Sequence, residues 1–351
     1  MLVQQKLTLL FLCTCLYSVI ISVFYWQSPH FSYFKKARPQ FDTFTHCLGC
    51  ERIRMNAGDT KTVSDIEFLI MIPSAPENHA KRQRIRSTWG SATSRFRRRQ
   101  IFFFIGTTPD KELQKRIFRE NTSWKDIIQP DIQDSFKNLT YKSLSMLYWV
   151  HYRLVDDRFH PKFILKCDDD NLVDIFRLED YLETLDLYDD EIVCAVQEEA
   201  VPARLEHEQK FIDDTTWSEP LYPKCCLGPA YLIAPEAISG LILAHQESSL
   251  PLVPYEDVYI TGILTKAANI SLIPFPPHIY SHTPYDEKVI MHGALSTLGG
   301  FELDVRWELA QREALGDDTY EELQALKEEE EIAKQIRLKE QNLLLQKQGI
   351  A

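Results

Sequence analysis

The stretch FILKCDDDNLVD, residues 163–174, joins an apolar run to three consecutive aspartates. The run FILKC fits a strand that is covered on both faces, because such strands read as short, continuous apolar segments. Asp168, Asp169 and Asp170 would then lie at the carboxyl end of this strand, where open α/β sheets bind their ligands. Adjacent carboxylates repel one another unless a cation lies among them, and oxygen ligands suit Mg²⁺ or Mn²⁺. An acidic turn that merely faces water is the alternative.

Similar apolar runs occur on both sides of this stretch. They begin at Phe68, Ile101, Ile192 and Ser271. Between them, residues 139–154, 175–187 and 258–268 show helical spacing of apolar positions. Strands that alternate with helices predict an α/β layer architecture. Neither of the glycine-rich phosphate-binding motifs G-x-G-x-x-G and G-x-x-x-x-G-K-S/T occurs in the sequence. If a nucleotide binds, a divalent cation on the acidic triplet could hold its phosphates instead.

The charge of the chain is acidic overall but locally basic. Its 351 residues carry a formal net charge of -12, which argues against a nucleic-acid partner for the protein as a whole. Eight basic and no acidic residues lie between positions 78 and 109, which indicates an anion site in that stretch. Arg82 and Arg86 lie four apart, on one face of a helix, so both could reach a phosphate or hold an acid. A solvated basic face fits the charge pattern equally well.

The N-terminal residues decide the expected compartment. Residues 7–26 contain no charged side chain and are long enough to cross the hydrocarbon core of a membrane. A cleaved signal peptide would have a shorter apolar region and an A-x-A-like site, which is missing here. The positive-inside rule argues against a lumenal position for the residues that follow this segment. Sequons at Asn121, Asn138 and Asn269 support a lumenal position, because they would be used only in the secretory lumen.

This organisation predicts five segments. They are a cytoplasmic tail (1–6), a transmembrane signal-anchor (7–26), a stem (27–64), one globular domain (65–300) and an acidic helical C-terminal extension (301–351). Beyond Gly316 we expect a solvated helix rather than a coiled coil, because its apolar positions keep no heptad.

Six cysteines lie outside the expected anchor, an even number that is compatible with up to three disulfides in an oxidising lumen. A zinc site is not favoured, because Cys47 and Cys50 have no second C-x-x-C or nearby histidine pair to join them. The pairing of the cysteines and the oligomeric state, a homo-oligomer included, are left open by the sequence.

A further pair of acids, Glu256 and Asp257, opens an apolar helical pattern in PYEDVYITG. Acids in the first turn of a helix commonly act only as caps, so the pattern by itself is weak support for a catalytic base.

Taken together, five motifs resemble the β-1,3-glycosyltransferase family, which includes β-1,3-galactosyltransferases and β-1,3-N-acetylglucosaminyltransferases, with Fringe as a more distant relative. In order along the chain they are RQRIRSTWG, DSFKNLTYKSL, KCDDDNLVD, YPKCCLGPAYL and YEDVYITG, within residues 65–300. The resemblance implies a Golgi type II membrane protein with a GT-A fold and a lumenal body. It also implies an inverting hexosyltransferase that uses a UDP-sugar and Mn²⁺.

The resemblance carries roles to individual positions. Asp168, Asp169 and Asp170 match the DxD-type motif that binds the nucleotide ribose and the metal, with Asp170 as the direct ligand. Asp257 matches the catalytic base. A late histidine completes the metal site in similar enzymes, and His282 looks like that position, with His278 and His292 as competitors. The residues Arg82, Arg86 and Lys142 match positions near the donor.

The chain also departs from the family pattern. Cys167 stands where Thr or Ala is common before the acidic triplet, and Gly228-Pro229-Ala230 replaces the usual G-x-G. That second segment lies near the acceptor in the family, so the acceptor sugar is in doubt. Galactose is the favoured donor sugar among hexoses and N-acetylhexosamines, and a glycolipid or a glycoprotein is the expected acceptor.

Two other functions compete with this interpretation. A catalytically degenerate sugar-binding protein or chaperone of the same fold would explain the altered Gly228-Pro229-Ala230 segment, although Asp257 and the acidic triplet are retained. A haloacid-dehalogenase-like phosphatase would use Asp168 and Asp170 as nucleophile and acid, but its second acidic motif has no good candidate in the sequence.

Overall fold

The computed structural model describes residues 66–92, 96, 98–154, 159–208, 211–247, 252–281, 289–293, 300–316, 320–321 and 324–325. All of them belong to the second of two compact units, Arg52–Ala351. Within these ranges no helix has the length and apolar composition that crossing a membrane requires. The expected tail, anchor and stem lie outside the described residues.

The centre of the described domain is a mixed seven-stranded sheet with the order β3-β2-β1-β4-β7-β6-β8. All neighbouring pairs are parallel except those that involve β7, which runs antiparallel to β4 and β6. The strands are β1 (Phe68–Ser74), β2 (Arg99–Ile105), β3 (Ile127–Ile128), β4 (Phe163–Cys167), β6 (Glu191–Gln197), β7 (Cys225–Ile233) and β8 (Ser271–Pro274). The five apolar runs in the sequence are therefore confirmed as β1, β2, β4, β6 and β8.

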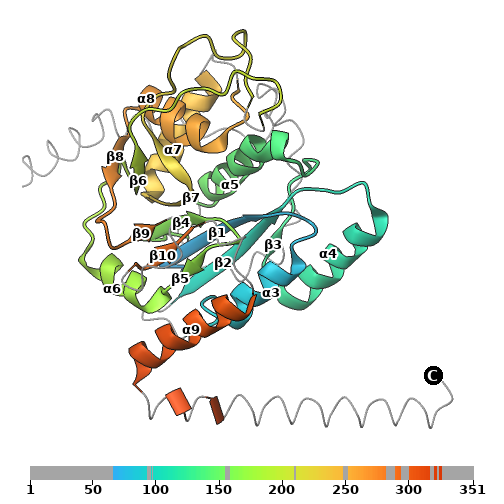
Figure 1. Ribbon diagram of the computed structural model, residues 1–351, viewed down its shortest axis with the longest axis vertical. Helices are drawn as coiled ribbons and strands as arrows, with labels where there is room; N and C mark the ends of the chain where they lie inside the picture. The colour runs from blue at the N-terminus through green and yellow to red at the C-terminus, as the bar shows by residue number, and fades with distance from the viewer. Residues whose placement is uncertain are drawn as a thin grey trace, which may run out of the picture. The chain divides into compact units, whose positions relative to one another are not determined.

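Helices cover both faces of this sheet, as an α/β layer architecture requires (Figure 1). On one face lie α5 (Leu139–Arg153), α7 (Pro235–Glu247) and α8 (Thr265–Ala268), and on the other lie α3 (His79–Ser87), α4 (Lys111–Trp124), α6 (Ile175–Thr184) and α9 (Gly300–Leu315). A short 3-10 turn, η2 (Phe136–Asn138), precedes α5. Every residue of β1 and β4 is buried, which explains why these strands read as continuous apolar runs.

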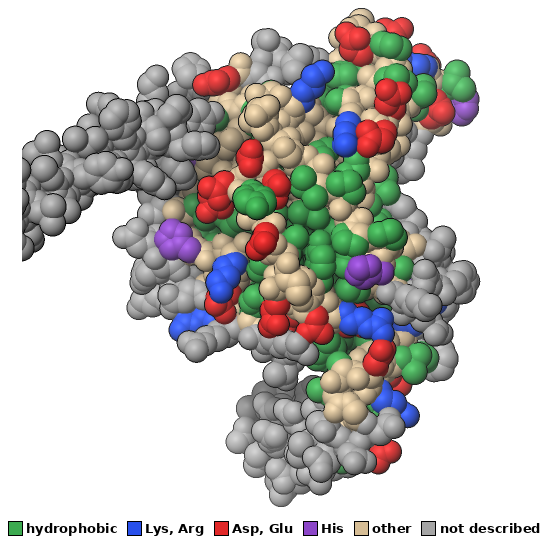
Figure 2. Space-filling view, turned by 90° about the vertical axis from the view of Figure 1, so that its left-hand side faces the viewer, with side chains coloured by type: hydrophobic (Ala, Val, Ile, Leu, Met, Phe, Trp, Pro, Cys, Tyr) green, Lys and Arg blue, Asp and Glu red, His purple; other side chains and the backbone are tan. Residues whose placement is uncertain are grey.

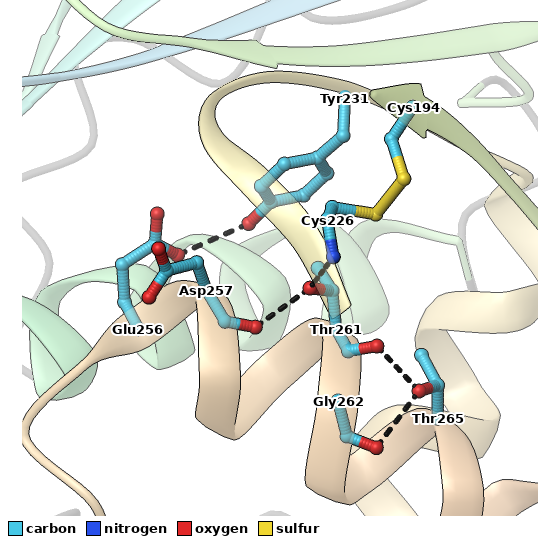
Figure 3. The surroundings of a disulfide bond; sticks show 8 residues. All are labelled: Cys194, Cys226, Tyr231, Glu256, Asp257, Thr261, Gly262 and Thr265. Atoms are coloured by element: carbon cyan, nitrogen blue, oxygen red, sulfur yellow. Dashed lines mark hydrogen bonds between the residues drawn. A yellow bond between two sulfur atoms is a disulfide. The ribbon is translucent and has the colours of Figure 1, made fainter. Parts of the chain in front are cut away.

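The helix expected over residues 258–268 differs from the prediction. Its first part, η3 (Asp257–Leu264), is a π-helix, and only α8 has α-helical geometry. The Thr261 hydroxyl donates to the Asp257 carbonyl (2.6 Å), and the Thr265 hydroxyl donates to the Thr261 carbonyl (2.6 Å), as Figure 3 shows. Hydroxyls bonded to carbonyls four residues earlier disturb the regular ladder, which apolar periodicity does not reveal.

A second sheet, β5-β10-β9, follows the acidic triplet and is formed by β5 (Leu172–Val173), β9 (Tyr280–Ser281) and β10 (Met291–His292). Helix α9 packs beside it. Its Trp307 is buried and stacks on Phe176 of α6 at a centroid distance of 5.8 Å. The boundary expected at residue 300 therefore falls at the first residue of a helix that packs on the domain.

A disulfide joins Cys194 of β6 to Cys226 of β7, beside η3 (Figure 3). Cys167 is a buried free thiol at the end of β4. Cys47 and Cys50 lie outside the described residues. On the face seen in Figure 2, hydrophobic side chains gather near the middle, and acidic side chains lie around them with scattered Lys and Arg.

Candidate active site

The acidic triplet follows β4 directly, at the carboxyl end of the parallel strands. Asp169 is buried, and its Oδ2 accepts hydrogen bonds from the Ser74 hydroxyl (2.7 Å) and from Asn78 Nδ2 (2.8 Å). Ser74 is the last residue of β1, which pairs with β4 in the sheet. The location predicted for the triplet is confirmed, and Asp169 is fixed by the neighbouring strand.

Lys81 of α3 lies between two carboxylates of the triplet. Its Nζ is 3.2 Å from Asp169 Oδ1 and 3.3 Å from Asp170 Oδ2. Burial lowers the pKa of Lys81, but the charges of Asp169 and Asp170 outweigh this effect and raise it. An ammonium that bridges two carboxylates shows that the triplet attracts positive charge.

The arginines expected near the donor lie in a buried ion-pair network. Arg82 donates to both carboxylate oxygens of Glu120, at 2.9 and 2.8 Å, and Arg86 donates to Glu120 (2.7 Å) and to Asp126 (2.7 and 2.8 Å). Arg86 also lies over the Phe103 ring at 4.7 Å. Buried guanidinium groups need counterions, and α4 supplies Glu120.

Five of the eight basic residues in the stretch predicted to bind an anion, Lys81, Arg82, Arg84, Arg86 and Arg99, are paired with acids of the same chain. Arg99 is paired with Glu179 (2.7 Å), and Arg84 with Asp304 of α9 (3.1 Å). With Lys81 on the triplet, these five residues form internal ion pairs, whereas Arg98 is exposed and Arg95 and Arg97 lie outside the described residues. Counting charges in the sequence does not reveal these ion pairs, because the acidic partners lie outside the basic stretch.

Two of the expected donor residues nevertheless meet at Ser74. Arg82 Nη1 donates to the Ser74 hydroxyl (3.0 Å), and Lys142 Nζ donates to the Ser74 carbonyl (3.1 Å) and to Asp134 Oδ2 (2.9 Å). Since the same hydroxyl donates to Asp169, Ser74 connects these positions to the triplet. Ser74 belongs to none of the predicted site residues, and its only signal in the sequence is its position directly after the first apolar run.

Asp168 belongs to a different cluster, on the side of the triplet that faces β7. Lys166 Nζ donates to Asp168 Oδ1 (2.7 Å), to Glu256 Oε1 (2.8 Å) and to the Gly228 carbonyl (2.6 Å). Burial raises the pKa of Asp168 to about 6, with Lys166 opposing the shift and Glu256 adding to it. Burial lowers the pKa of Lys166, but the charges of Asp168 and Glu256 raise it well above its usual value.

Asp257 begins η3, next to Glu256 (Figure 3). A β-carbon added at Gly228 would lie 3.3 Å from Asp257 Oδ2 and 3.5 Å from Glu256 Oε1, so both acids face this glycine. The Tyr231 hydroxyl donates to Glu256 Oε2 (3.2 Å). The structure thus brings Asp257 to the same region as Asp168, although the two lie 89 positions apart.

An aromatic cluster borders Asp257 from the β6–β7 connection. The Tyr222 ring lies 5.6 Å from Trp217 and 6.2 Å from Tyr255, centroid to centroid. The Tyr222 hydroxyl is buried and has no hydrogen-bond partner among the described residues. Burial, followed by the charges of Tyr255 and Asp257, raises the pKa of Tyr222. The sequence analysis did not identify this cluster, although Tyr222 opens the motif YPKCCLGPAYL.

Of the metal ligands expected from the sequence, Asp169 and Asp170 lie among the described residues. In the described part of the chain, no group of three or more His, Cys, Asp or Glu side chains is arranged to hold a metal ion. His282 lies outside the described residues. Of its competitors, His278 is exposed, and His292 is buried with Nε2 3.1 Å from the Val289 carbonyl oxygen.

The donor set that is visible still fits a hard divalent cation. Mg²⁺ and similar ions are commonly held by one or two carboxylates together with substrate phosphates and water. Asp169 and Asp170 supply carboxylate oxygens that already share one positive charge, that of Lys81. Asp170 has the more accessible side chain, with 23% exposed against 8% for Asp169, and it is the better candidate for a direct ligand.

Comparisons with known proteins show the family to which the sequence is similar. A family model described as Galactosyltransferase matches residues 80–276. The mouse lactosylceramide 1,3-N-acetyl-beta-D-glucosaminyltransferase is 30% identical over 254 residues, covering 67% of this chain and 65% of that protein. Beta-1,3-galactosyltransferase 5 of Pan paniscus is 27% identical over 208 residues, covering 58% and 66% respectively. The chain thus spans somewhat less than two thirds of the length of these relatives.

Proposed function

The chain belongs to the galactosyltransferase family, and on that premise we propose that it is an inverting β-1,3-glycosyltransferase. It transfers a hexose or N-acetylhexosamine, with galactose favoured, from a UDP-sugar to the 3-hydroxyl of an acceptor sugar on a glycolipid or glycoprotein. The observation that carries this proposal is that Lys166 joins Asp168 of the acidic triplet to Glu256, the residue that precedes Asp257.

The donor is bound at the carboxyl ends of β1 and β4, in a domain of GT-A type. Asp168 and Asp169 bind its nucleotide part, and Lys142 lies near them because it donates to the carbonyl of Ser74, whose hydroxyl donates to Asp169. Arg82 and Arg86 support the donor site indirectly, because their ion pairs with Glu120 hold α3 against α4. Asp170, Asp169 and His282 would hold Mn²⁺, which would neutralise charge that develops on the leaving diphosphate.

The acceptor is bound on the side of Asp257, between the aromatic cluster and Gly228-Pro229-Ala230. Aromatic rings such as Trp217 offer an apolar surface with a polar edge, which suits the mixed faces of a sugar ring. The Tyr222 hydroxyl, which has no hydrogen-bond partner among the described residues, adds a donor and acceptor at this position.

The reaction is a single displacement. The Asp257 carboxylate takes the proton from the acceptor 3-hydroxyl, whose oxygen forms the new bond to the anomeric carbon. The bond between that carbon and the diphosphate oxygen breaks, and UDP leaves with the electron pair. Attack on the face opposite UDP inverts the anomeric centre.

The same proposal places the protein in the Golgi membrane. Residues 7–26 would anchor it as a single-pass type II protein, with the catalytic domain in the lumen, where UDP-sugars and secretory glycans meet.

The experiment that tests the function follows UDP release by the full-length chain, purified in detergent. A panel of UDP-sugars is combined with neutral glycolipid and glycoprotein glycan acceptors, with and without Mn²⁺. We expect release that requires the metal, one donor and one acceptor class. Metal-dependent UDP binding without release for any pair would instead support the sugar-binding alternative, and absence of UDP binding would refute the donor site.

The proposed base is tested separately with Asp257→Asn. General-base catalysis supplies about 10²- to 10⁴-fold, so we expect kcat to fall by that order while UDP affinity is retained. Asp186→Asn, a neutralised acid in the exposed connection after α6, is the control and should behave as the wild type. Normal turnover of Asp257→Asn would refute the assignment.

A further inference from the structure

We propose that Lys166 is the positioning residue that sets the separation between the donor side of the site and the base Asp257. This inference rests on the proposed function. Lys166 lies in β4, with its side chain buried, and it contacts the residue that follows β4 by one position, the residue that precedes η3 and a carbonyl of β7. No role for this side chain follows from the sequence motifs alone.

The Lys166 ammonium makes three hydrogen bonds. Lys166 Nζ donates to a triplet carboxylate (Asp168, 2.7 Å), to the acid that precedes the base (Glu256, 2.8 Å) and to a carbonyl of β7 (Gly228, 2.6 Å). An ammonium has three hydrogens, so these contacts use all of its donors. The end of β4, the start of η3 and the middle of β7 are therefore joined through one nitrogen atom.

These hydrogen bonds have a consequence for Asp257. Gly228 is in contact range of Asp257, because a β-carbon there would lie 3.3 Å from Asp257 Oδ2. Lys166 holds the carbonyl of this glycine and the side chain of the residue next to Asp257, so it fixes the base from two directions. The Tyr231 hydroxyl, which donates to the other oxygen of Glu256, completes the support.

The charge of Lys166 matters as well. Asp168 and Glu256 are carboxylates that repel each other, and the Lys166 ammonium between them offsets this repulsion. Lys81 does not serve here, because it bridges Asp169 and Asp170 from α3. Removing the Lys166 charge should let the two acids separate, and η3 would carry Asp257 away from the triplet.

The test compares Lys166→Met, Glu256→Gln, the double variant and Lys162→Met in the full-length chain. Lys162 is exposed and lies just before β4, so its variant is a matched control for the loss of a lysine. For each protein, kcat and donor KM, UDP affinity with Mn²⁺ by calorimetry, and the midpoint of thermal unfolding are measured. A misplacement of about 1 Å can cost about 100-fold in rate.

We expect Lys166→Met to lower the unfolding midpoint and to reduce kcat by at least about tenfold, with donor KM and UDP affinity within about threefold of the wild type. In the double variant one of the unpaired acids is removed, so the midpoint should recover while kcat stays low. Recovery of stability without recovery of rate separates positioning from folding.

Two results would overturn the inference: a wild-type kcat in Lys166→Met, or a kcat that recovers together with the midpoint in the double variant. Failure of the proposed function looks different, because the wild type itself would then show no transfer with any donor and acceptor.

Discussion

Glu120 is the buried acid that holds α3 against α4, beside the proposed donor site. It lies on α4 and accepts hydrogen bonds from Arg82 and Arg86, and its Oε2 is 3.0 Å from His79 Nδ1. Glu120→Gln keeps the size of the side chain and removes its charge, which takes away the acid paired with Arg82 and leaves Arg86 with Asp126 alone. The free energy of unfolding should therefore fall.

The size of the loss follows from the acid's pKa. Burial alone would raise it, but hydrogen bonds from Arg82, His79 and Arg86 lower the pKa of Glu120 from 4.5 to about 2. This difference corresponds to about 3 kcal/mol of stability in the ionised state, since one pKa unit is about 1.4 kcal/mol. Breaking a buried pair by removing one partner typically costs about 3–5 kcal/mol, which agrees.

The measurement is urea unfolding of wild type and Glu120→Gln between pH 7 and pH 3. Because the folded pKa is lowered, the contribution is complete above the unfolded value near 4.5 and is lost as the pH falls toward 2; about 2 kcal/mol should be gone by pH 3. The difference between the two proteins should therefore be about 3 kcal/mol at pH 7 and shrink with acidification.

Glu112→Gln is the matched control on the same helix. Glu112 is exposed and pairs with exposed Lys115 at 2.7 Å, and such surface pairs contribute about 0–1 kcal/mol. The reasoning fails if Glu120→Gln loses no more than this control, or if its deficit is unchanged between pH 7 and pH 3.

Four further substitutions test the packing around the site, each by urea unfolding at pH 7. Gly106→Ala would place a β-carbon 2.7 Å from a backbone carbonyl oxygen and should cost about 1–3 kcal/mol, whereas Gly240→Ala, with 3.5 Å of clearance within α7, should gain about 0.5–1 kcal/mol. Trp307→Ala removes the buried ring that holds α9 and should cost about 3 kcal/mol; an unchanged midpoint would show that α9 does not stabilise the domain. Cys226→Ser opens a loop with a sequence separation of 32 and should cost about 3–4 kcal/mol, a difference that should vanish if both proteins are first reduced.

The sequence predicted the layer architecture well, because the period of apolar residues is a local property. β1 and β4 are buried along their whole length, and their apolar runs marked them directly. The strand β7 was not predicted. It contains Gly228 and Pro229, which are unusual inside a strand, and its pairing with β6 is irregular at Cys194, where the register shifts. A strand that bends at a site does not show a regular pattern.

In the candidate site, too, some positions could be predicted from local sequence patterns and others could not. The position of the triplet after β4 and of Asp257 at a helix start followed from local patterns and from the resemblance. The partners of Arg82 and Arg86 did not, since charge counting cannot distinguish a basic surface from a set of buried ion pairs. Glu120 lies 38 positions from Arg82, and no periodicity connects them.

Lys166 shows that one of these long-range pairings did leave a local signal. It is the single charged residue in FILKC, a run whose neighbours on both faces are apolar. In a strand covered on both sides, a lysine cannot reach water, so its charge must be neutralised inside the domain. The acids available at the end of β4 are those of the triplet, and a second acid must come from an element packed beside it. A lone lysine in a continuous apolar run next to an acidic motif therefore predicts an interior ion pair at the site, and only the identity of the distant partner, Glu256, requires the structure.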